Sequence, residues 1–169
     1  MIKNTVTSKA IVTIDLGDFF PKAEECVYLD MATFLFKGLI LKEADFRQQI
    51  KDTDWSTYRN KYVGLFCSVD AIVPMWAYMV ITAELSGIAR MVHFGKRVDF
   101  PLLFVHENIA LLNASAYEGQ RIVVKGCGDK ETDEQAFIMI TRKLAPVARA
   151  IMFGEACSSV PVFKKTLET

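Results

Sequence analysis

The chain has 169 residues, of which 51% are hydrophobic, and its 20 cationic and 20 anionic side chains give a formal net charge of +0. This composition excludes a disordered chain, and the length excludes two large domains. No block of Lys and Arg could follow a phosphate backbone, so we expect no nucleic-acid partner. Apolar stretches are interrupted before the ~20 residues of a membrane span, and residues 1–5 do not open a signal peptide. We therefore expect a cytoplasmic protein without membrane contact, whose four cysteines are reduced.

The N-terminal segment predicts two short strands, Ile11–Leu16 and Cys26–Leu29, because both are rich in apolar and β-branched residues. Asp30 is placed to cap a helix that runs through Phe36. We expect this extension to form a sheet edge or a small antiparallel sheet. The segment Val160–Phe163 is expected to pair there as well.

An internal repeat follows. An offset of 59 residues pairs Phe46–Gly95 with Val105–Gly154 without a gap. Of these 50 pairs 12 are identical, where composition alone predicts roughly 3. Asp70 pairs with Asp129 in this alignment.

Each repeat predicts a helix, a strand, a second helix and a second strand. The first has Glu43–Asp52, Tyr62–Phe66, Met75–Leu85 after Pro74, and Ile88–Phe94; the second has Leu102–Leu112, Arg121–Val124, Glu134–Leu144 and Val147–Phe153. Thr132, with Gln135 three residues later, has the pattern of a capping box.

Strands that alternate with helices of this length indicate parallel βαβ units. We expect an α/β fold with one four-stranded, largely parallel sheet and helices on both faces. The whole chain, residues 1–169, is expected to be a single domain. It would comprise an N-terminal β extension (residues 1–42), repeat one (43–96), repeat two (102–155) and a C-terminal strand and tail (156–169).

Three cysteines, Cys67, Cys127 and Cys157, closely follow predicted strands. Ligands of open α/β sheets bind at the carboxyl ends of the strands, so these thiols are expected at one such edge. Three thiolates can hold Zn or Fe and leave a position for water or a substrate. Asp70 and Asp129 are candidate further ligands, and acid/base groups or loop caps are the alternatives for them.

Two other interpretations of the cysteines stay open. They could be packed, inert thiols, or Cys67 or Cys127 could be a nucleophile activated by a helix N-terminus. The two histidines, His93 and His106, fall in a strand and a helix away from the expected edge. A histidine-based metal site or a Ser/His/Asp triad is therefore disfavoured.

A glycine-containing turn predicts a weak anion site. Gly126 and Gly128 lie between a strand and a helix, where backbone amides can hold a phosphate, and Ser158 and Ser159 follow the last repeat strand. Lys164 and Lys165 could add to this pocket, although the Walker spacing is missing. Exposed parts of Trp76 or Phe19-Phe20 could build a homodimer contact.

The sequence also resembles a known family. The runs Asp54–Tyr58, Lys61–Tyr78 and Ile151–Pro161 are similar to the bacterial domain-of-unknown-function 2480 family. That family has no assigned activity, and the resemblance supplies no catalytic residues. Its members often occur beside iron–sulfur cluster assembly genes, which implies a metal or sulfur-handling role and an iron–sulfur assembly protein as a partner. The competing hypothesis is a non-catalytic, homodimeric interaction module with packed cysteines.

Overall fold

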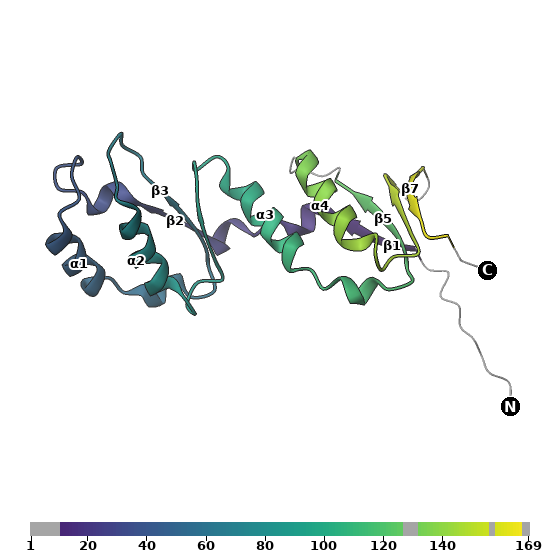
Figure 1. Ribbon diagram of the computed structural model, residues 1–169, viewed down its shortest axis with the longest axis horizontal. Coiled ribbons are helices and arrows are strands. Elements are labelled where there is room, and N and C mark those ends of the chain that lie inside the picture. Colours follow the sequence, from purple (N-terminus) through teal and green to yellow (C-terminus); the bar gives the residue numbers. More distant parts are fainter. Residues whose placement is uncertain (1–10, 127–131, 156–157, 167–169) are drawn as a thin grey trace, which may run out of the picture. The chain divides into compact units, whose positions relative to one another are not determined.

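The computed structural model describes residues 11–126, 132–155 and 158–166. The chain forms two compact units (Figure 1): unit 1 comprises Met1–Phe20 and Val105–Thr169, and unit 2 comprises Pro21–Phe104. The boundary falls inside the helix α3 (Phe100–Leu111). In the described ranges, no helix has the length and apolar character that crossing a membrane requires. The single domain and its four segments stay a prediction.

Unit 2 contains a three-stranded parallel sheet in the order β2-β3-β4. Its elements are β2 (Cys26–Asp30), α1 (Glu43–Asp52), β3 (Tyr62–Phe66), α2 (Met75–Leu85) and β4 (Met91–Phe94). Successive side chains of a strand point to opposite faces, so β3 contributes to two cores.

One face of β3 packs Val63 and Leu65 against Phe46 of α1 and Ile81 of α2. The other face brings Tyr62 and Met91 together with Phe100 and Phe104 from the start of α3. Gly64 lies on this second face, where a Cβ atom would come within 2.6 Å of the Phe100 ring. The sheet therefore needs a residue without a side chain at this position.

Unit 1 contains a four-stranded sheet in the order β1-β5-β6-β7. Its strands are β1 (Ile11–Asp15), β5 (Arg121–Lys125), β6 (Ala150–Phe153) and β7 (Val160–Lys164), and its helix α4 spans Glu134–Leu144. β1, β5 and β6 are parallel, whereas β7 adds to β6 in the antiparallel direction. Ile122 and Val124 of β5 pack against Ile109 of α3 and Ile140 of α4.

The two units share local structure at the 59-residue offset. The bounds of β5, α4 and β6 are those of β3, α2 and β4 plus 59. Backbone hydrogen bonds recur with them: Asn60 N donates to Ile88 O at 2.9 Å, and Gly119 N donates to Val147 O at 2.9 Å. Corresponding strands are thus held in the same way in the two units.

The predicted mixed α/β class with largely parallel pairing is confirmed, but a single four-stranded sheet is wrong. The strands of repeat one and repeat two belong to two different sheets in the described structure. The reason is that β1 pairs with β5 and β2 pairs with β3, so each sheet has its own N-terminal strand.

The N-terminal strands do lie at sheet edges, as expected, but the antiparallel alternative is wrong because both pair in parallel. β7 pairs with β6, and with neither of the two described N-terminal strands. After β2, Asp30 caps only a short 3-10 helix, Met31–Phe34, by accepting from Ala32 N at 2.9 Å. The helix after β5 is capped by Asp133 and not by Thr132, because the Asp133 carboxylate accepts from Ala136 N.

Candidate functional site

The three predicted cysteine ligands do not follow strands of one sheet. Cys67 comes directly after β3 of unit 2, whereas Cys127 and Cys157 come after β5 and β6 of unit 1 and lie outside the described residues, as does Asp129. Cys67 is half-buried, and its thiol contacts Val69 O at 3.4 Å. Asp70 is exposed. Among the described residues, no three His, Cys, Asp or Glu side chains form a group that could hold a metal.

The carboxyl edge of the unit 1 sheet carries an ion pair between neighbouring strands. Asp15 ends β1 and Lys125 ends β5, and their Oδ2 and Nζ atoms are 3.1 Å apart. Burial raises the pKa of Asp15, but hydrogen bonds from Gly17 N and from Lys125 outweigh it, so the pKa is lowered. Each charged group has the other as its partner, so this ion pair joins β1 to β5.

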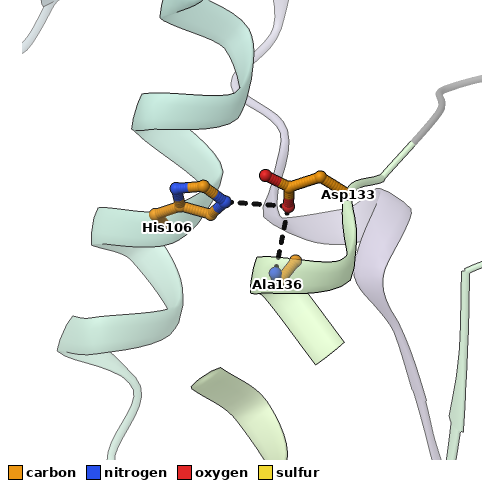
Figure 2. Close-up of polar contacts among 3 residues, drawn as sticks. All are labelled: His106, Asp133 and Ala136. Atoms are coloured by element: carbon orange, nitrogen blue, oxygen red, sulfur yellow. Dashed lines mark hydrogen bonds and ion pairs between the residues drawn. The ribbon is translucent and has the colours of Figure 1, made fainter. Parts of the chain in front are cut away.

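A second pair, between His106 and Asp133, connects α3 to the start of α4 (Figure 2). His106 Nε2 lies 2.8 Å from Asp133 Oδ1, and the same oxygen accepts from Ala136 N at 3.0 Å. Burial raises the pKa of Asp133, but the hydrogen bonds from His106 and Ala136 lower it further than burial raises it. The carboxylate therefore acts as a helix cap and as the partner of the imidazole at once.

Replacing Asp133 with alanine is expected to reduce the free energy of unfolding by about 0.5–2 kcal/mol at pH 7, the range measured for lost helix caps. Because the folded-state pKa is lowered from 3.8, this contribution exists above that value and is lost as the pH falls through the lowered pKa. Urea unfolding of wild type and D133A at pH 7 and at pH 2.5, roughly a pH unit below the ordinary Asp value, measures it. An equal difference at both pH values would contradict this account.

The carboxyl edge of the unit 2 sheet has a similar local design, with no ion pair among its described residues. Asp30 ends β2, and its Oδ1 accepts from Ala32 N and from Ser68 N, at 2.9 and 3.0 Å. Burial raises the pKa of Asp30, but the Ser68 side chain and these two backbone N–H groups lower the pKa further than burial raises it. Ser68 follows Cys67, so the carboxylate fixes the turn that holds this cysteine. The edge is organised by internal hydrogen bonds.

Residues of the predicted anion site follow two neighbouring strands of unit 1. Gly126 directly follows β5, and Ser158 and Ser159 follow β6, which is the neighbouring strand; Gly128 lies outside the described residues. Ser158 N donates to Glu155 O, and Ser159 Oγ contacts Met152 Sδ at 3.6 Å. Because β7 is antiparallel to β6, Lys164 lies opposite Ala150, at the other end of β6 from these serines. Lys164 and Lys165 therefore cannot complete that pocket.

An apolar surface lies on α2 in unit 2. One side of this helix is buried, with Ala77, Ile81 and Leu85 at most 1% exposed. On the other side, Met75 is 76% exposed and Met79 70%. Tyr78 lies between them, and its ring packs edge-on against Phe94 of β4 at 5.0 Å; Phe94 is itself 64% exposed. We call Met75, Tyr78, Met79 and Phe94 the α2 face.

Unit 1 provides the comparison for this surface. At the 59-residue offset, Met75 corresponds to Glu134 and Ala83 to Arg142. Helix α4 therefore has one apolar and one polar side, whereas α2 is apolar on nearly all sides. Next to α4, strands β6 and β7 border a groove of ≈ 420 Å³ lined by Phe137, Ile138 and Phe153 among others. A helix that faces solvent usually has a polar outer side. Of the two corresponding helices, α2 is therefore the unusual one, because its outer side is apolar.

Sequence reasoning missed two features of these sites. His106 was expected away from the sheet edge, yet it meets Asp133, because the start of α4 lies beside α3. The repeat gives no signal for it, since the corresponding residue is Arg47. Asp15 could have been found in the way that Asp30 was predicted as a cap: each ends an apolar run, and each caps a 3-10 helix by accepting the N–H two residues later.

Comparison with known proteins gives a family and no characterised relative. The family model described as "Protein of unknown function (DUF2480)" matches residues 1–165. No curated protein and no solved structure matches the chain.

Proposed function

We propose that this chain, which belongs to the DUF2480 family, is an interaction module that binds a partner polypeptide through the α2 face of unit 2. The observation that carries the proposal is the exposure of Met75, Met79 and Phe94 around Tyr78. Exposed, contiguous apolar side chains cost free energy in water and mark interaction sites in folded proteins. Methionine side chains suit such a surface because they adapt to the shape of a partner.

The polar groups of the described sheet edges support this choice over a catalytic site. Asp15, Asp30 and Asp133 each accept backbone N–H groups within the chain, and two of them also pair with a cation or an imidazole. These contacts account for the carboxylates structurally. The α2 face has no such internal explanation.

A photo-reactive amino acid at Met79 tests the proposal in cells that contain the natural partner. We expect polypeptide adducts from position 79 and none from Leu39, which is 65% exposed in the same unit but not on the α2 face. Introducing M75E should reduce the yield about ten-fold, the loss expected for a hot-spot residue. Glu is the residue that α4 has at this position, so the helix should tolerate it. Adducts that are unchanged in M75E would contradict the proposal.

The proposal includes an internal duplication of the two units, with helices on both faces of each sheet. Its support is the common offset of three elements and the packing of Phe100 on the face of β3 opposite to α1. A duplication explains why one copy could keep a polar helix, α4, while the other acquired the α2 face. A homodimer and an iron–sulfur assembly protein are the two partner identities expected from the sequence, and both stay predictions.

A Zn or Fe site at Cys67, Cys127 and Cys157 is a separate proposal with less support. It required strands of one sheet to bring the thiols together, and β3 belongs to a different sheet from β5 and β6. Elemental analysis of protein purified anaerobically without a metal-binding tag tests it independently of the α2 face.

A further inference from the structure

Strand β4 ends its sheet, and its counterpart in unit 1 does not. In the described structure the unit 2 sheet has the order β2-β3-β4, whereas β6, which corresponds to β4, is followed by β7. Both strands are bonded to their inner neighbours alike: Gly95 N donates to Leu65 O, and Gly154 N donates to Val124 O. The position beside β4 is thus the one that β7 fills beside β6.

The backbone of β4 is suited to accept a strand there. Met91 N and Gly95 N donate toward β3. Since backbone groups alternate in direction along a strand, those of Val92 and Phe94 point to the outer edge. Their counterparts Ile151 and Phe153 are opposite Phe163 and Val160 of β7. The same two backbone positions therefore pair in unit 1 and lie at the open edge in unit 2.

Cationic side chains surround this edge at both ends. Arg90 precedes β4, and Lys96 and Arg97 follow it within three residues. None of the three forms an ion pair with a described carboxylate, although Arg90 and Arg97 lie over the rings of Tyr62 and Tyr28, both at 5.0 Å. Asp99 is the nearest acidic residue along the chain. At the corresponding position to Lys96, unit 1 has Glu155.

We infer that β4 binds an extended segment of another protein as an antiparallel strand, with apolar residues in the segment and acidic residues at its ends. This inference rests on the proposed function, because the apolar residues of the added strand would lie against the α2 face. Antiparallel strand addition supplies main-chain hydrogen bonds, and the side chains supply specificity. A second copy of this chain is less suitable, since antiparallel pairing of β4 with itself, Val92 opposite Phe94, would bring Arg90 opposite Lys96.

A labelled peptide tests this with fluorescence polarisation on the full chain. The probe is Val-Pro-Val-Phe, the sequence of Val160–Phe163, with two glutamates added at each end. We expect saturable binding, and binding about ten-fold weaker at low salt when lysines replace the glutamates. V92P should abolish binding, since proline removes the outward N–H without touching the hydrogen bonds to β3. L39E is the matched control and should bind normally.

A change in the peptide covers the case in which V92P does not fold. N-methylation of the first valine, which matches Val160, removes the N–H that would bond to Phe94 and leaves the protein unaltered. If M79E abolishes binding but V92P and N-methylation of the peptide leave it unchanged, strand addition is wrong, and binding through the α2 face is still supported. If no variant weakens binding, both proposals are wrong. Equal binding of the lysine peptide and the glutamate peptide would contradict the inference that the partner segment is acidic. A wild-type dimer that V92P dissociates, together with no peptide binding, would show that β4 binds a second copy of this chain instead.

Discussion

Replacing Phe46 with alanine is expected to destabilise unit 2 by about 3–5 kcal/mol, the range for large-to-small substitutions at fully buried aromatic residues. Phe46 is 0% exposed, and its ring meets those of Phe34 and Trp76 edge-on, both at 5.5 Å. The substitution removes these contacts and leaves a cavity between α1 and α2. Both tryptophans of the chain, Trp55 and Trp76, belong to unit 2. Their fluorescence therefore reports urea unfolding of this unit.

The control for this measurement is L39A, at an exposed position of the same unit, which should change the free energy of unfolding by less than about 0.5 kcal/mol. An F46A transition at the wild-type urea concentration would mean that Phe46 is not part of the unit 2 core.

Replacing Gly64 with valine is expected to destabilise unit 2 by about 3 kcal/mol, at the upper end of the usual cost of overpacking. Two Phe100 ring atoms lie 2.6 Å from the position of a Cβ atom, and a third lies at 2.8 Å. Phe100 is itself fully buried beside Phe104, so the ring has little room to move. Valine favours strands, so a loss of stability would have to come from this clash.

The double variant G64V/F100A separates the clash from any general effect of valine in β3. Removing the ring should make G64V much less costly in the F100A background than in wild type, which is the signature of coupled neighbours. Strictly additive effects in urea unfolding would show that the two positions do not meet.

Local patterns predicted several elements at their observed bounds. Glu43–Asp52 has apolar residues at helical spacing, Tyr62–Phe66 is a short apolar run typical of a buried strand, and Met75–Leu85 is a longer apolar run after Pro74. These local signals need no knowledge of partners. The same holds for Glu134–Leu144, although its cap shifted from Thr132 to Asp133. Both residues have capping side chains, so the sequence alone did not distinguish them.

The sequence pattern did not predict which strands belong to the same sheet. β1 pairs with β5 across more than a hundred residues, and the alternation in Ile11–Asp15 would fit any buried neighbour. Because the repeat begins after both N-terminal strands, it suggested one sheet for four repeat strands. The expected cysteine site was argued from that single sheet, and it stays a prediction. The α2 face is a different case: Met75–Leu85 is apolar on nearly all sides, and this pattern alone is typical of a helix buried between layers.

The pairing of β1 with β5 also has a consequence during synthesis of the chain. Unit 2 is one continuous stretch, so it can fold as soon as residue 104 has left the ribosome. β1 is made first, yet its partner Arg121–Lys125 emerges more than a hundred residues later. β1 therefore stays unpaired while unit 2, which follows it in the sequence, folds. Such a long-range pairing forms slowly because closing the intervening loop costs conformational entropy, so Ile11–Asp15 stays open to aggregation until β5 has been made.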